Sequence, residues 1–212
     1  MALKRKITAA IFAVMLLLTG CNAEDPIRPM VDLGPEGSLN CLEISRFTGG
    51  FVEDGSDAPV RDVAAILVAN NTGKFLELAT ITYQVGNRTA TFKVTGLPHG
   101  ERAWVLESNR LSLKAGDELV LENCEETYHP SPVLTTDALS VSRQGKSLTL
   151  TNTSGRKLSN VAVYYKNTLE DGTYMGGISY MTVFGNLEPG ASVTQIKDHF
   201  DDTSEIVRFS FQ

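Results

Sequence analysis

The amino-acid sequence predicts an all-β protein made of two tandem β-sandwich domains. Three observations carry this prediction: apolar and polar residues alternate over short stretches, Gly- and Asn-containing turn signals separate these stretches, and segment 66–84 is repeated at 148–166. Alternation with a period of two is typical of strands that bury one face, and regularly spaced turn signals are typical of sandwiches. No stretch after residue 20 shows a clear helical period.

The chain begins with a segment that is typical of an export signal. Three basic residues at positions 4–6 precede an apolar run at 7–18, which ends in the tetrapeptide LTGC at 18–21. The run is shorter than the roughly 20 apolar residues of a membrane-spanning helix, and it has the length of a signal-peptide core. The basic start favours retention of this end on the cytoplasmic side.

The LTGC ending resembles the lipobox of bacterial lipoproteins. The resemblance implies cleavage of the signal peptide 1–20 between Gly20 and Cys21, and attachment of acyl chains such as palmitate to Cys21. Two or more chains anchor a protein stably, since each buried methylene contributes about 0.8 kcal/mol. We therefore expect a lipoprotein on the extracytoplasmic face of a bacterial cell membrane, with a Gram-positive surface favoured. The alternative is an ordinary cleaved signal with a coincidental cysteine.

The charge of the mature chain excludes some partners. Without residues 1–20 the chain has 16 basic and 25 acidic residues, which gives a net charge of −9. Such a surface repels phosphate backbones, so we expect no nucleic-acid partner. It also disfavours a basic membrane-binding patch, which leaves the lipid as the membrane contact. Residues 21–37 contain three prolines and two glycines and are expected to form a flexible spacer.

The two remaining cysteines predict a disulfide bond. Cys41 and Cys124 each lie in a strand-like context, 83 positions apart. A bridge that closes so long a loop would stabilise the fold by roughly 4–5 kcal/mol on the chain-entropy model, as an upper limit. The alternative is two free buried thiols, because cysteine also packs as a small hydrophobic residue.

The internal repeat defines the domain plan. The two copies align without a gap at an offset of 82, and a later block aligns at an offset of 90, so the second copy has eight additional residues. Asn-x-x-Gly in each copy is typical of a tight turn between strands. The paired positions are Asn70 and Asn152, Gly73 and Gly155, Leu76 and Leu158, Tyr83 and Tyr165, Leu97 and Leu187, and Gly100 and Gly190.

The repeat places one immunoglobulin-like sandwich at 38–127 and a second at 133–212. Residues 128–132, YHPSP, are expected to be a linker that its two prolines stiffen. The segment LTLTNTSGRKLSNVAVYYKN at 148–167, with LEPGAS at 187–192, resembles the FxLYD-type sandwich modules of bacterial lipoproteins. The literal Phe-x-Leu-Tyr-Asp signature is not present. These modules mostly have no assigned activity, so the resemblance implies a fold and little about function.

The mature sequence shows no motif for a catalytic site, a cofactor or a metal. None of the three histidines, His99, His129 and His199, has a second ligand at the spacing of a zinc site. No Gly-x-Ser-x-Gly nucleophile elbow is present. The acidic segment 197–202 is a weak calcium candidate, and a solvated turn is the alternative. We therefore expect a protein that is not an enzyme and holds no cofactor.

Because no catalytic, cofactor or metal motif is found, binding of a partner is the function that the sequence favours. Tyr174 and Met175 lie among glycines in the longer second copy and are expected to form an exposed tip, and Tyr164 faces away from the core side of its strand. Tyrosine and methionine are enriched where proteins bind partners, although packing within the domain is the alternative for all three. The first hypothesis is a non-catalytic binding module for an envelope protein or a glycan. The others are a small extracytoplasmic hydrolase or glycan-acting subunit, and a structural spacer or assembly factor.

Overall fold

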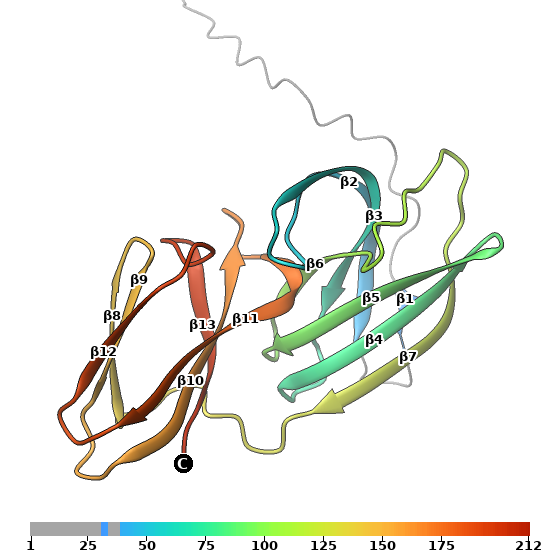
Figure 1. The fold of residues 1–212 in the computed structure, drawn as a ribbon. Helices are drawn as coiled ribbons and strands as arrows, with labels where there is room; N and C mark the ends of the chain where they lie inside the picture. Colours follow the sequence, from blue (N-terminus) through green and yellow to red (C-terminus); the bar gives the residue numbers. More distant parts are fainter. Residues whose placement is uncertain (1–30, 34–38) are drawn as a thin grey trace, which may run out of the picture.

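The computed structural model describes residues 31–33 and 39–212, and this part of the chain consists of strands, turns and loops (Figure 1). The prediction of an all-β, sandwich-like fold is confirmed. Within the described ranges no helix is long and apolar enough to cross a membrane. The predicted signal peptide with its cleavage site at Gly20 and Cys21, and most of the spacer, lie outside the described residues.

The described residues form thirteen strands. Those of the first half are β1 (Val31–Asp32), β2 (Asn40–Phe51), β3 (Ala58–Ala69), β4 (Leu76–Val85), β5 (Arg88–Leu97), β6 (Arg102–Leu106) and β7 (Val120–Tyr128). Those of the second half are β8 (Leu139–Gln144), β9 (Ser147–Asn152), β10 (Leu158–Thr168), β11 (Tyr174–Leu187), β12 (Ser192–Ile196) and β13 (Ser204–Ser210).

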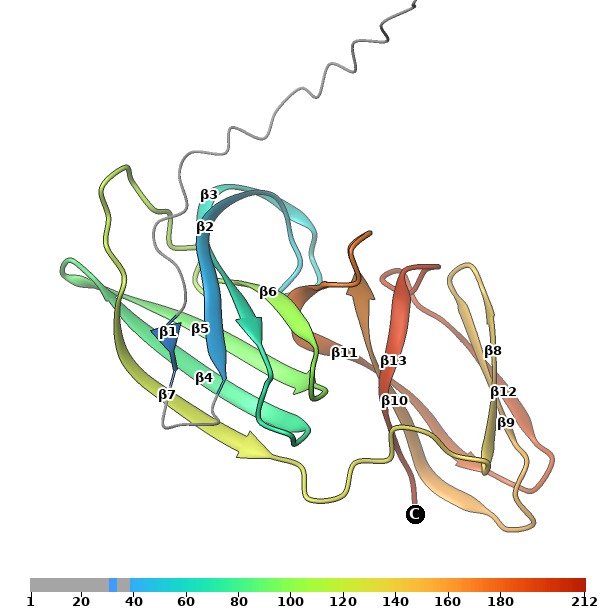
Figure 2. The same cartoon turned by 180° about the vertical axis from the view of Figure 1, so that it is seen from behind.

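Both halves use the same strand pairing, as the repeat requires. In the first half β2-β3-β6 and β5-β4-β7 are neighbours within two sheets, and in the second half β8-β9-β12 and β11-β10-β13 are their counterparts. Figure 2 shows the two groups of strands side by side from behind. Each group buries the alternating apolar face of its strands between two layers.

A buried asparagine holds the corresponding turn in each half. The Asn70 amide donates to the Leu97 carbonyl at 2.7 Å, and the Asn152 amide donates to the Leu187 carbonyl at 2.8 Å. In both copies the side-chain oxygen accepts from the backbone N–H two residues further on. The residues that the repeat pairs in sequence thus make the same contacts, which satisfy backbone groups that burial would otherwise leave without partners.

Two hydrophobic clusters form the main core. The first lies mainly between strands β2–β7, includes the fully buried Ile66, Ile81 and Phe92, and takes in Tyr174 of β11 and Val207 of β13. The second lies within strands β8–β13 and includes Leu150 and Tyr165. Each cluster fills one pair of facing sheets, which is what a sandwich architecture demands.

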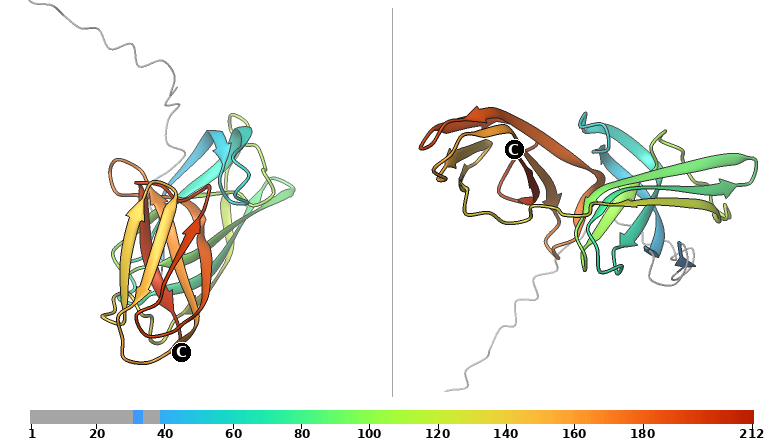
Figure 3. Two further views of the ribbon diagram at one scale, coloured as in Figure 1. Left: turned by 60° about the vertical axis from the view of Figure 1, so that its left-hand side comes forward. Right: turned by 90° about the horizontal axis from the view of Figure 1, so that it is seen from below.

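The two halves are joined by the extended β10–β11 hairpin. The first residues of β11 pair in parallel with β6, with Tyr174 opposite Ala103 and Met175 opposite Trp104. One seven-stranded sheet therefore runs through both halves in the order β1-β2-β3-β6-β11-β10-β13. Figure 3 shows β11 reaching from the second half to the first. The boundaries at 38–127 and 133–212, and with them the division into separate domains, stay predictions; β7 ends at Tyr128, the first residue of the predicted linker.

Candidate ligand-binding site between the two halves

The extended hairpin corrects one expectation about binding residues. Tyr174 is only 3% exposed and belongs to the core cluster of the first half, and its hydroxyl donates to Glu205 at 3.3 Å. Met175 is partly buried against Phe51 and Leu106. The prediction that these two residues form an exposed, pliable tip is therefore wrong. They pair with β6, and burial of their apolar surface there is more favourable than exposure to solvent.

Tyr164 keeps some exposure on the outer face of β10. The Arg208 guanidinium lies over the Tyr164 ring, 4.1 Å from the ring centre, and makes a cation–π contact. It lies opposite Met181, whose side chain is 53% exposed. Its role as a partner contact stays a prediction.

The two cysteines lie in the same core cluster. The structure describes Cys41 as a buried free thiol on β2 and Cys124 as a half-buried free thiol on β7. Burial raises the pKa of Cys41, and burial followed by the charge of Glu126 raises the pKa of Cys124 to about 12. The disulfide between them stays a prediction.

Glu53 is the central residue of the junction. It lies in the turn between β2 and β3, and its Oε1 accepts from the Leu106 N–H at 2.7 Å and from the Gly177 N–H at 2.9 Å. Its Oε2 accepts from the Ile178 N–H at 3.2 Å. One carboxylate therefore ties a turn of the first half to β6 and to the start of β11.

Lys166 holds the same segment of β11 from the other side. The side chain is 1% exposed, and its Nζ donates to the carbonyls of Gly176 and Gly177 at 3.2 and 2.6 Å. Ser179 adds two hydrogen bonds to Thr95 of β5, at 2.7 and 2.8 Å. The backbone of residues 176–179 is therefore bound by side chains on both flanks.

A glycine permits this close approach. A Cβ atom on Gly177 would lie 2.0 Å from the Lys93 carbonyl oxygen and 2.6 Å from Val105 Cγ1. Real Cβ atoms are not found at such distances from backbone. Any side chain at position 177 would therefore push β11 away from β5 and β6.

The pKa values at the junction are shifted by burial. Burial raises the pKa of Glu53, although the backbone N–H donors and the Lys166 charge oppose the shift. Burial lowers the pKa of Lys166 to about 7, and attraction to Glu53 opposes this shift. Both changes follow from the poor solvation of charge in the interior.

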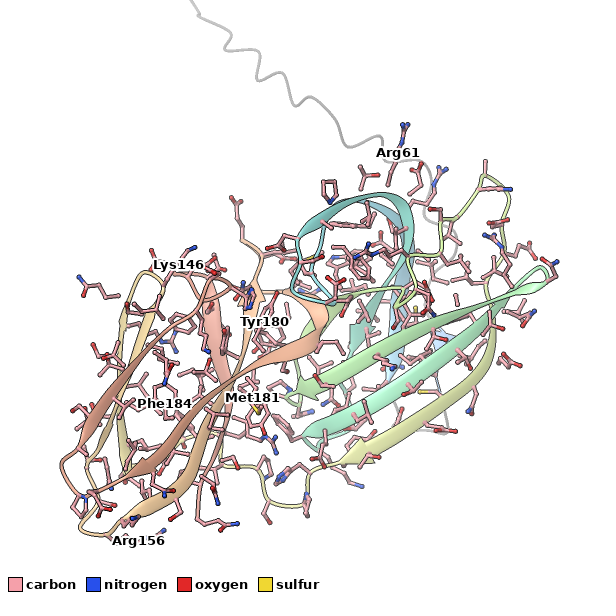
Figure 4. All side chains as sticks on the ribbon, in the orientation of Figure 1. Arg61, Lys146, Arg156, Tyr180, Met181 and Phe184 are labelled. Carbon is pink, nitrogen blue, oxygen red and sulfur yellow. The ribbon has the colours of Figure 1, made fainter. Side chains whose placement is uncertain are left out.

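Two pockets open beside Glu53. The first has a volume of about 410 Å³ and the second about 290 Å³, and both are lined by Glu53, Asp54 and Ile178. The first pocket is completed by Phe51, Lys93, Ser108, Asn109 and Arg110. The second is completed by Val52, Gly55, Ser179, Tyr180, Met181 and His199. Figure 4 shows Tyr180 and Met181 where the two halves meet.

An aromatic stack forms one wall of the second pocket. The rings of Tyr180 and His199 are nearly parallel, 4.6 Å apart, and Tyr180 also stacks on Tyr165 at 5.4 Å. Phe200 packs edge-on against Tyr165. The stack connects the core of the second half to the pocket and gives this wall a rigid shape.

The acidic segment 197–202 does not assemble a metal site in the structure. In the described ranges no three His, Cys, Asp or Glu side chains lie together in a way that could hold a metal ion. Asp198 instead pairs with Lys146 at 3.0 Å, and Asp201 accepts from the Thr203 N–H at 2.8 Å. These contacts are those of a solvated turn.

Sequence reasoning missed Glu53 and Lys166. Lys166 lies next to Tyr165 on the strand, so alternation turns it away from the sandwich interior, where a lysine is normally solvated. The sequence signal that remained was the Gly176-Gly177 pair in the longer second copy, which marks a close backbone contact.

A scan against models of protein families finds no match for this chain. A search of curated proteins also finds no matching protein.

Proposed function

We propose that this protein is a lipid-anchored, non-catalytic binding protein on the extracytoplasmic side of a bacterial membrane, with two immunoglobulin-like modules. The lipobox-like ending at Cys21 supports the anchor, and the repeated strand plan supports the modules. The membrane contact is the lipid, and the ligand is an envelope component, either a protein or a glycan. The resemblance to FxLYD-type modules belongs to the same proposal.

One observation carries the choice of a binding role: two pockets adjoin at the junction of the halves and share Glu53. Ligand sites favour concave surfaces at the meeting of structural units, with a few polar groups that fix the ligand. The pocket of 410 Å³ has the size of a small-ligand site. Three backbone N–H groups hold the Glu53 side chain, so the shared wall between the pockets is rigid.

Displaced pKa values in a cleft are the feature that would favour the hydrolase alternative. Glu53 and Lys166 have such values, but their hydrogen-bonding capacity is directed to backbone groups. Lys166 is also 1% exposed, so its ammonium does not reach either pocket. A general acid or base must lie within hydrogen-bond reach of its substrate. We therefore assign the pair a positioning role.

The binding role is tested by filling the first pocket. Full-length protein in detergent is incubated with small molecules extracted from the bacterial envelope, and retained compounds are identified by mass spectrometry. Asn109 is exposed and lines the pocket, so Asn109→Trp is expected to abolish retention by occupying the ligand volume. Asn123→Trp, at an exposed position on β7, is the matched control and should retain the same compounds. Equal retention by both variants, or none by the wild type, would contradict the role.

A further inference from the structure

One edge of the second half is open. β12 ends its three-stranded sheet and pairs with β9 alone (Figure 1). At its two ends the Ala191 carbonyl and the Lys197 N–H bond to the β9 side, at 2.9 and 3.0 Å. Backbone direction alternates along an antiparallel strand, so Ser192, Thr194 and Ile196 direct their N–H and C=O groups away from β9. These groups have no hydrogen-bond partner within the part of the chain that the structure describes.

The repeat gives β12 a counterpart in β6. The Asn70 N–H donates to the Glu101 carbonyl at 3.0 Å, and the Asn152 N–H donates to the Ala191 carbonyl at 2.9 Å, so the two strands begin with the same hydrogen bond. At the offset of 90, the three residues on the open edge of β12 have equivalents in β6. These equivalents are Arg102, Trp104 and Leu106.

In the first half the equivalent edge is occupied. Trp104 lies opposite Met175, in the parallel pair that β6 makes with the start of β11. The Leu106 N–H donates to the Glu53 carboxylate at 2.7 Å. The first half therefore shows what an edge of this kind accepts, which is an extended segment that runs parallel to it.

The open edge leaves apolar surface in water. Leu106 is fully buried, whereas its counterpart Ile196 is 71% exposed, the largest exposed fraction among the large hydrophobic residues of the described ranges. Ala103 is also fully buried, whereas its counterpart Val193 is only partly buried against the second core cluster. A segment laid along β12 would cover this surface, and that burial is favourable.

β12 also lacks the features that protect an exposed edge from pairing. Its sequence, SVTQI, has no charged residue and no proline, and its pairing with β9 has no bulge. Every other terminal strand of the described sheets has at least one charged residue. Examples are Asp32 in β1, Lys93 in β5, Glu122 in β7, Arg143 in β8 and Glu205 in β13. Proteins use charge, proline and bulges to block their edges, so β12 is the edge left competent to pair.

We propose that the open edge of β12 binds an extended segment of another protein, which adds to the sheet as a parallel strand. The edge presents N–H and C=O groups at the spacing of a strand, which a polypeptide backbone matches and a glycan does not. The start of β11 on β6 indicates the chemistry of the segment: uncharged, with an aromatic residue like Tyr174 followed by small residues. The site is separate from the pockets beside Glu53, so this inference goes beyond the proposed function.

The test uses a segment of this chain as the probe. A peptide with the sequence of residues 171–179, DGTYMGGIS, blocked at both ends, is added in excess to full-length protein in detergent. Amide hydrogen exchange is then measured by mass spectrometry. The amides of Ser192, Thr194 and Ile196 should exchange fast in the protein alone, and at least about tenfold more slowly when the peptide is bound.

Two variants at position 194 separate the backbone from the side chain. Thr194→Pro removes the central N–H of the open edge and leaves the bonds to β9 in place, so it should weaken peptide binding by about tenfold. Thr194→Ala is the matched control. It also removes the hydroxyl, which is hydrogen-bonded to Thr149 at 2.7 Å, but it keeps the N–H and should bind like the wild type.

The proposal is overturned if the peptide leaves exchange at 192–196 unchanged, if it protects β6 alone, or if Thr194→Pro and Thr194→Ala bind it equally. It is also overturned if 192–196 are protected without peptide and sedimentation shows a dimer, because a second copy would then be the occupant. The exchange comparison uses the wild type, so it decides the question even where Thr194→Pro fails to fold. Failure here leaves the pocket role standing, since Asn109→Trp tests that role separately.

Discussion

Lys166 has an environment that lysine rarely has in proteins. Its ammonium group is buried and bonded to two carbonyl oxygens, and burial lowers its pKa to about 7. An unfolded lysine has a pKa near 10.4. Between these two values the unfolded chain binds more protons at this residue than the folded chain, so the free energy of unfolding rises with pH. Glu53, whose pKa is raised, contributes the opposite slope above the ordinary pKa of a glutamate.

The free energy of unfolding should therefore depend on pH through Lys166. From pH 7 to 8.5 we expect the wild type to gain stability relative to Lys166→Met, with a slope of at most about 1.4 kcal/mol per pH unit. Urea unfolding at both pH values measures the difference. Lys114→Met serves as the control, because Lys114 is exposed and should follow the wild type. Parallel pH dependences of the wild type and Lys166→Met would refute the assignment.

At the scale of elements, the β10–β11 hairpin distinguishes the second half from the first. Its counterpart, β4–β5, turns at Gly86 and Asn87, whereas β10 and β11 are connected by residues 169–173. The extension inserts Tyr174 into the first core cluster and covers the edge of β6. Covering an edge removes a row of unpaired backbone groups that would otherwise invite aggregation.

Truncation of this anchor should loosen the contact between the halves. Tyr174→Ala removes a buried aromatic ring and is expected to destabilise the protein by about 3–5 kcal/mol. Hydrogen exchange should become faster at the β6 amides, because the pairing with β11 depends on the ring. The control is Leu169→Ala at the partly exposed end of the hairpin. Equal stability of the two variants would count against the hairpin as an anchor.

The sequence predicts individual strands better than it predicts their contacts. Alternation correctly placed Ile81 and Tyr165 in buried faces, and the repeat correctly paired Asn70 with Asn152. Alternation gives the side of a strand on which a residue lies, but not what covers that side. Lys166 donates to the Gly176 and Gly177 carbonyls of the next strand, but the Glu53 carboxylate that accepts from Gly177 lies more than a hundred residues earlier, so the pockets at Glu53 had no local signal.

At the scale of the whole molecule, the predicted lipid is expected to hold the protein in the membrane fraction of the cell. Cys21→Ser removes the thiol that would accept the acyl chains, so the protein should move from the membrane fraction to the medium. Cys124→Ser is the control, because its thiol lies in the sandwich, and it should remain with the membrane. Cell fractionation followed by immunoblotting measures both. Continued membrane association of Cys21→Ser would contradict lipid anchoring.

The parallel pairing of β11 with β6 makes the order of the two repeat copies along the chain matter. The upstream copy supplies an open edge and the downstream copy supplies the long arm that occupies it. The tight β4–β5 connection has no such arm, so a chain with the two copies exchanged in order could not rebuild this contact. The two copies share one strand plan but contribute differently to this contact, because the first provides the edge of β6 and the second provides the long hairpin that covers it.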